Sequence, residues 1–143
     1  MEIAFWDSSM VVPLCVRQAI TSNAQVLGEQ FRMVVSWFAR VEVHSSIARM
    51  LRMGQITANE RVQGFVLLDR IRADWREVTP SEAMRQKAED FVERFPLRAA
   101  DALQLASAWI WCQGHPRGRP FIAGDVQLLD AARQLGFQTV EPL

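Results

Sequence analysis

The chain has 143 residues, half of them hydrophobic, and its 16 basic residues balance its 16 acidic ones. A chain of this length and composition can bury a core of its own, and we predict a single domain over residues 1–143. The net charge of zero argues against a protein that binds nucleic acid through bulk positive charge alone.

The amino-terminal segment and the cysteines argue against further classes of protein. Glu2 and Asp7 stand where a secretory signal would need basic charge and then an apolar run. The longest apolar stretches, such as Leu105–Cys112, are too short to span a bilayer. We therefore expect a cytoplasmic protein without membrane contact. Cys15 and Cys112 have apolar neighbours and no CxxC spacing, which is typical of buried thiols rather than of a disulfide or a zinc site.

Strand and helix patterns alternate along the chain. The predicted strands are Glu2–Trp6, Met33–Ser36, Trp75–Val78, Phe121–Ala123 and Phe137–Val140. One helix is predicted to start at Ser8 or Ser9, and the others span about Asn23–Phe31, Phe38–Met53, Thr57–Ala73, Ser81–Phe95, Leu97–Cys112 and Val126–Leu135. This alternation predicts an α/β fold, with helices on both faces of a mainly parallel sheet in a three-layer α/β/α sandwich.

Four acidic residues occupy positions that should meet at one edge of this sheet. Asp7 directly follows the first strand and Asp125 follows the fourth, while Glu42 and Asp101 lie near the starts of two helices. Ligand sites of parallel α/β sheets lie beyond the C-terminal ends of the strands, so we expect the four side chains to converge there. Converging carboxylates in apolar surroundings are costly unless a cation compensates them. Mg²⁺ or Mn²⁺ accepts such oxygen ligands and can activate water against a phosphodiester.

Each acid also has a purely structural interpretation. Asp7 and Asp125 could cap the helices that follow them, and the dipole of its helix could favour Asp101. Glu42 could pair with Arg40 or Arg49. Both interpretations stay open from the residues alone.

Other kinds of site find less support in the sequence. His44 and His115 are too few and too far apart for a zinc site, and no histidine accompanies Ser8 or Ser9 for a catalytic triad. A receiver-like or phosphatase-like α/β domain would also place acids at strand ends. The first class needs a lysine late in the chain, where Lys87 does not fit, and the second needs an aspartate where Ser9 stands.

Four segments resemble, in order and spacing, the acidic motifs of PIN-domain ribonucleases of the VapC-like toxin type. They are Phe5–Ser9, Trp37–Val43, Leu97–Ala106 and Ile122–Asp125, of which Leu97–Ala106 is the most specific. The resemblance covers essentially the whole chain. It implies a PIN-like α/β/α fold, metal-dependent endoribonuclease activity, homodimerisation, and inhibition by a small antitoxin protein.

The resemblance also implies roles for single residues. Asp7, Glu42, Asp101 and Asp125 are the expected catalytic acids, and Ser8 is the expected supporting hydroxyl. We predict that Asp7, Asp101 and Asp125 bind Mg²⁺ or Mn²⁺ directly, while Glu42 binds the metal, directly or through water, or acts as a base.

Two further arginines and two departures from the family pattern complete the prediction. Arg40 and Arg98 could contact the RNA backbone or, equally, form ion pairs with the acids. Ala123 stands where the family often has a hydroxyl residue, so one supporting hydrogen bond is expected to be missing. Gln104 stands where histidine is common, and we expect it to face packing rather than chemistry. The alternative function is a catalytically weak PIN-fold module that binds RNA or an antitoxin.

Overall fold

The computed structural model describes residues 1–141, which form strands and helices in the predicted order. The strands are β1 (Glu2–Trp6), β2 (Phe31–Ser36), β3 (Arg76–Val78), β4 (Pro120–Ile122) and β5 (Gln138–Val140). The helices are α1 (Ser8–Cys15), α2 (Thr21–Gln30), α3 (Ala39–Arg52), α4 (Ala58–Arg72), α5 (Glu82–Arg94), α6 (Ala99–Trp111) and α7 (Val126–Leu135).

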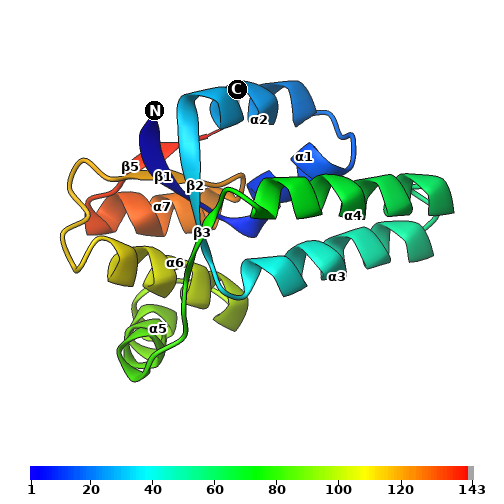
Figure 1. Ribbon diagram of the computed structural model, residues 1–143. Coiled ribbons are helices and arrows are strands. Elements are labelled where there is room, and N and C mark those ends of the chain that lie inside the picture. Colours follow the sequence, from blue (N-terminus) through cyan, green and yellow to red (C-terminus); the bar gives the residue numbers. More distant parts are fainter. Residues whose placement is uncertain (142–143) are drawn as a thin grey trace.

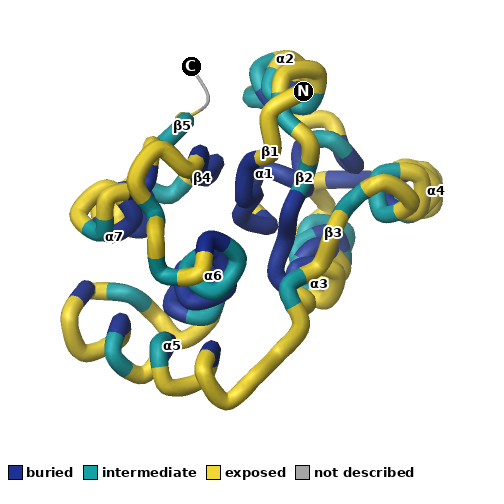
Figure 2. Tube along the Cα trace, turned by 60° about the vertical axis from the view of Figure 1, so that its left-hand side comes forward, coloured by how far each residue is buried: buried dark blue, intermediate teal, exposed yellow. Residues whose placement is uncertain are grey.

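The five strands form one sheet in the order β3-β2-β1-β4-β5, and every neighbouring pair is parallel. Helices α5, α6 and α7 cover one face, and α1, α2, α3 and α4 cover the other (Figures 1 and 2). The predicted three-layer α/β/α architecture is therefore confirmed. A receiver domain has the strand order 2-1-3-4-5, so this topology excludes that alternative.

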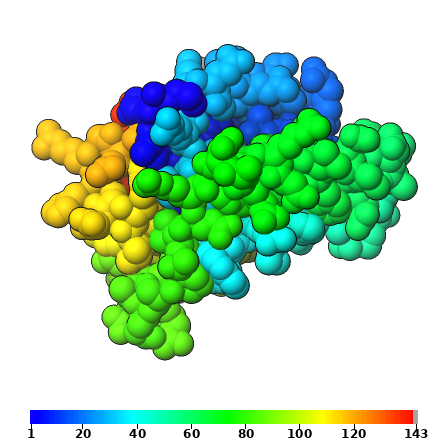
Figure 3. Space-filling view, viewed as in Figure 1, coloured from blue at the N-terminus to red at the C-terminus, as the bar shows by residue number. Residues whose placement is uncertain are grey.

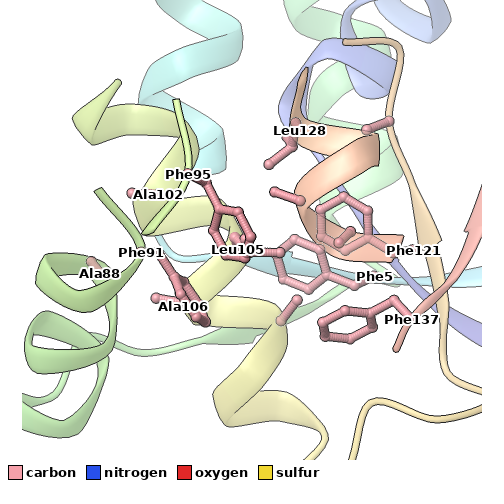
Figure 4. Packing of buried hydrophobic residues seen from close by; sticks show 14 of the residues in the cluster. Phe5, Ala88, Phe91, Phe95, Ala102, Leu105, Ala106, Phe121, Leu128 and Phe137 are labelled. Atoms are coloured by element: carbon pink, nitrogen blue, oxygen red, sulfur yellow. The ribbon is translucent and has the colours of Figure 1, made fainter. Parts of the chain in front are cut away.

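The central strand β1 is buried on both faces because its side chains alternate between two cores. Phe5 points toward α5, α6 and α7, where its ring stacks on Phe121 with 5.5 Å between centroids (Figure 4). Ala4 and Trp6 point toward the other layer, into the core formed with α1 and α3. Since β1 is fixed from both sides, the residue that follows it has a well-defined position.

Local sequence signals account for the ends of several helices. Thr57 and Glu60 form a capping box at the start of α4, and the Ser81 hydroxyl accepts a hydrogen bond from the Met84 N–H at the start of α5. Gly136 ends α7 with a φ of 109°, a left-handed conformation that favours glycine. The main difference from prediction is β2, which begins two residues earlier because Phe31 pairs in register with Glu2.

Neither the helices nor the cysteines of the described chain point to a membrane or a disulfide. Within residues 1–141, no helix combines the length and the apolar character that crossing a membrane requires. Cys15 and Cys112 are both buried free thiols, as predicted, and burial raises the pKa of Cys15 to about 12.

Candidate active site

The four predicted acids all lie at the C-terminal edge of the sheet. Asp7 follows β1, and Asp125 follows β4, the neighbour of β1 on one side. On the other side, β2 leads into α3, whose first turn carries Glu42. Asp101 is in the first turn of α6, a helix that packs against β2. The strand order therefore brings together residues that are up to 118 positions apart in the chain, from Asp7 to Asp125 (125 − 7).

Asp7 is the most deeply buried of the four acids, with 4% of its surface exposed. Its carboxylate accepts hydrogen bonds from the backbone N–H of Ser9, at 3.2 Å, and from the Ser9 hydroxyl. Burial raises the pKa of Asp7 to about 6, and repulsion from Asp101 adds to the rise while the Ser9 hydrogen bonds oppose it. Asp7 also caps α1, so its structural interpretation holds together with any functional one.

The supporting hydroxyl is Ser9, which corrects the prediction of Ser8. Asp7 is the N-cap residue of α1, and a side chain at this position accepts bonds from the residues of the first turn. The Ser9 hydroxyl oxygen also accepts a hydrogen bond from the Gly124 N–H, at 3.4 Å. Ser9 therefore links the loop after β1 to the loop after β4, next to the buried Ala123, where the expected family hydroxyl is missing.

Glu42 is held from α6 by Gln104. The Gln104 Nε2 group donates a hydrogen bond to Glu42 Oε1, across 62 positions of sequence. Burial raises the pKa of Glu42 to about 7; repulsion from Asp7 and Asp101 contributes, and the bond from Gln104 opposes the rise. The expectation that Gln104 faces only packing is wrong: its side chain is 1% exposed, yet it contacts an acid of the site.

Asp101 and Asp125 complete the group. Burial raises the pKa of Asp101, repulsion from Asp125 contributes, and the positive charge of Arg98 opposes the rise. The Asp125 side chain accepts a hydrogen bond from the Gln127 N–H, at 2.9 Å, and so caps α7. The capping interpretation thus holds for Asp125 as well, without removing its charge from the site.

Electrostatic repulsion acts among the four carboxylates, and Asp101 takes part in most of it. Asp101 is coupled to each of the other three carboxylates. Among residues 1–141, none of the four forms an ion pair with a lysine or arginine. Arg40 and Arg98 are exposed, and neither forms the ion pair with these acids that was one of their two predicted roles. The negative charge of the site is therefore largely uncompensated.

The chemistry of the site fits a hard divalent cation. It offers carboxylate oxygens without cationic partners, and the buried Oε1 of Gln104 has no hydrogen-bond partner in the described chain. At the same time, the side chains of residues 1–141 do not bring any three His, Cys, Asp or Glu residues close enough together to hold an ion. The structure therefore shows an electrostatically coupled group of acids rather than an assembled coordination sphere.

A hollow of about 720 Å³ lies at the opposite edge of the sheet from the four acids. It is lined at the N-terminal ends of the strands by Met1, Phe31 and Trp75, and by residues of α2 and α4. The light-blue segment that contains α2 and the start of β2 lies beside the green α4 in Figure 3. None of the four acids lines this hollow, so we call it the N-terminal groove and separate it from the candidate active site.

The fold is the PIN-like fold of VapC-type toxins. A chain of a toxin–antitoxin complex from Klebsiella pneumoniae is similar with a TM-score of 0.64 and 15% sequence identity, and the alignment covers 98% of each chain. A chain of VapBC2 from Rickettsia felis, in a crystal structure with a DNA fragment from the promoter, gives a TM-score of 0.65 and 10% identity, over 96% of this chain and 98% of that chain. No protein-family model matches the sequence, and no curated protein matches it significantly.

Proposed function

We propose that this chain is a divalent-metal-dependent endoribonuclease and the toxin of a toxin–antitoxin pair. The observation that carries the proposal is the group of four coupled carboxylates without cationic partners, at the sheet edge where α/β folds bind ligands. The PIN-like fold supports it, since both similar structures come from toxin–antitoxin complexes. The proposed partners are an RNA substrate, a small antitoxin protein and a second copy of the chain, in the cytoplasm.

The proposal gives each residue of the site a role. Asp7, Asp101 and Asp125 would hold Mg²⁺ or Mn²⁺, which when bound supplies charge neutralisation at the phosphate and a more acidic water. Glu42 accepts a proton at its carboxylate, which Gln104 holds in place. The Ser9 hydroxyl fixes the orientation of Asp7.

Two exposed arginines flank the acids and fit contacts with the RNA backbone. Arg40 lies two positions before Glu42 at the start of α3, and Arg98 is the N-cap residue of α6, three positions before Asp101. Guanidinium groups pair readily with phosphate oxygens, and neither side chain forms an ion pair with an acid of the site, although the charge of Arg98 acts on Asp101.

The test is cleavage of RNA by the purified chain with Mg²⁺, with Mn²⁺ and with EDTA. We expect cleavage only with a divalent ion, and we expect Asp7→Ala to abolish it. Asp130→Asn is the matched control, because Asp130 is an exposed acid of α7 that pairs only with Arg133 on the surface. Equal cleavage by wild type and Asp7→Ala would refute the proposal and indicate a contaminating nuclease. RNA binding without cleavage would favour the alternative of a catalytically weak binding module.

A further inference from the structure

A smaller hollow, of about 350 Å³, lies on the α5 side of the acids at the same edge of the sheet. Phe38, Met84 and Leu103 give it apolar walls, while Ser81, Glu82 and Arg85 line its polar side. Phe38 lies just after β2 and Ser81 just after β3, so the hollow lies at the C-terminal ends of these two strands. We call it the Phe38 hollow.

Two residues that line the Phe38 hollow are close in the chain to acids of the candidate active site. Phe38 accepts, through its carbonyl oxygen, the backbone hydrogen bond of Glu42 at 3.1 Å. Leu103 lies beside Gln104, which binds Glu42, and two positions after Asp101. Neighbouring strands of a sheet are about 5 Å apart, so Phe38 and Ser81 follow strands that lie about one and two spacings from β1, the strand that Asp7 follows.

An exposed indole contacts Phe38, one of the residues that line this hollow. Trp37 is 48% exposed, and no other aromatic residue is among the exposed large hydrophobic side chains of residues 1–141. Its backbone N–H donates to the Val78 carbonyl oxygen at 3.0 Å, which fixes the loop. Its ring meets the Phe38 ring edge-on, with 5.5 Å between centroids and 87° between planes. An aromatic ring that is fixed at its base but open on its surface offers a platform for a flat ligand.

We propose that Trp37 and the Phe38 hollow form a subsite for an unpaired nucleobase of the RNA strand, next to the phosphate that faces the acids. This inference rests on the proposed ribonuclease function. A base has a flat apolar surface that stacks on an indole, and its polar edges can accept a hydrogen bond from the Ser81 hydroxyl, whose oxygen accepts from the Met84 N–H, or from Arg85, which pairs with Glu82. The exposed Arg40, three residues from Trp37, fits the adjoining phosphate.

The subsite determines the class of RNA that fits. A base inside a duplex is stacked on its neighbours and paired along its edge, so it cannot lie on Trp37 without leaving the helix. The subsite therefore selects an RNA segment whose base is free, and it contributes affinity through stacking rather than through net charge. This agrees with a chain whose formal charge is zero.

The experiment measures binding of a fluorescein-labelled single-stranded RNA of about 12 nucleotides. It uses the cleavage-deficient Asp7→Asn variant, alone and combined with Trp37→Ala, Trp37→Phe or Met53→Ala. Met53 is the matched control, because it is a large exposed apolar residue at the other end of α3. We expect Trp37→Ala to weaken binding about tenfold, and Trp37→Phe and Met53→Ala to change it less than about twofold. The same RNA in a duplex should bind equally to all four proteins.

Two results would overturn the subsite. One is equal affinity of the Trp37→Ala and Met53→Ala proteins for the single strand. The other is a change of oligomeric mass on Trp37→Ala in analytical ultracentrifugation, which would make this face a contact between two copies. Cleavage by the wild type tests the ribonuclease proposal separately. A wild type that cleaves no RNA, together with a tenfold binding effect of Trp37→Ala, would refute the ribonuclease proposal and leave the subsite standing.

Discussion

The two edges of the sheet carry different kinds of side chain. At the N-terminal edge, Met1, Phe31 and Trp75 line the larger hollow together with Arg70 and Asp74, which are charges of opposite sign. At the C-terminal edge the hollow is smaller, but burial and then repulsion between carboxylates raise the pKa of Asp7, Glu42 and Asp101, and no acid of the site forms an ion pair in the described chain. The comparison teaches that uncompensated charge identifies the candidate active site better than the size of a hollow does.

Beside the loss expected for Asp7→Ala, the largest effect is expected at Asp101, the acid that repels the other three. Asp101→Asn should lower kcat for RNA cleavage at least about 100-fold, since it removes a charge from the centre of the site. Single-turnover cleavage with Mn²⁺ measures this, with Asp130→Asn as the control. A loss no greater than that of Asp130→Asn would mean that the C-terminal edge does not carry the chemistry.

The burial of acids at this edge also predicts how stability depends on pH. In EDTA, the free energy of unfolding should fall as pH rises from about 4 to about 7, because Asp7 and Glu42 bind protons more tightly in the folded chain than in the unfolded one. Below this range both acids are protonated in both states, and above it both are ionised in both states. Asp7→Asn should therefore stabilise the chain by about 2 kcal/mol near pH 8 and have little effect near pH 4.

Urea denaturation at a series of pH values measures this prediction. Glu2→Gln is a suitable control, because Glu2 is an exposed acid at the other end of β1. The prediction would be contradicted by a free energy of unfolding that is independent of pH between about 4 and 7. Equal destabilisation by Asp7→Asn at both ends of that range would also contradict it. Either result would show that folding does not raise the pKa of these acids.

A smaller effect is expected at Gln104. Gln104→Leu removes the donor to Glu42 with a side chain of similar size, and kcat should fall about tenfold while KM stays nearly unchanged. In a Glu42→Ala background the same substitution should have almost no further effect, because the hydrogen bond is already lost. Additive losses in this double-mutant cycle would mean that Gln104 acts only by packing α6.

The smallest effect is expected in the N-terminal groove. Leu67→Ala and Arg70→Ala change two residues that line it, at the edge away from the acids. Both variants should cleave RNA within about twofold of the wild type, since neither residue can reach the reacting phosphate. A large loss of cleavage with unchanged thermal stability would show that the N-terminal groove also takes part in catalysis, which would contradict the difference between the two edges.

Much of the fold follows from local signals in the sequence. The helical spacing of apolar residues and the residues at the helix ends predict two of the helices. Thr57 and Glu60 form a capping box that starts α4, and Gly136 ends α7. The apolar run before Asp7 predicts β1, since a central parallel strand is buried on both faces. The order of the strands depends on packing between distant elements, and the start of β2 at Phe31 depends on its pairing with Glu2.

The positions of the acidic residues could be predicted from the sequence, but the hydrogen bonds that hold them could not. The positions of Asp7 and Asp125 follow from strand ends, which are visible in the sequence. The choice of Ser9 over Ser8 depends on the exact start of α1, because adjacent residues of a helix point in different directions. The contact between Gln104 and Glu42 joins two helices 62 positions apart. One local signal could have indicated it: Gln104 lies three positions after Asp101, on the same face of α6.

The central claim is that the acids of the C-terminal edge bind a divalent metal ion. Its most direct test is a titration of the purified chain with Mn²⁺ near pH 8, in which electron paramagnetic resonance measures the concentration of the free ion. The account predicts that the wild type and Asp130→Asn bind Mn²⁺ alike, and that Asp101→Asn weakens binding at least about tenfold. Equal binding by all three proteins, or no binding by the wild type, would contradict a metal site built from Asp7, Asp101 and Asp125.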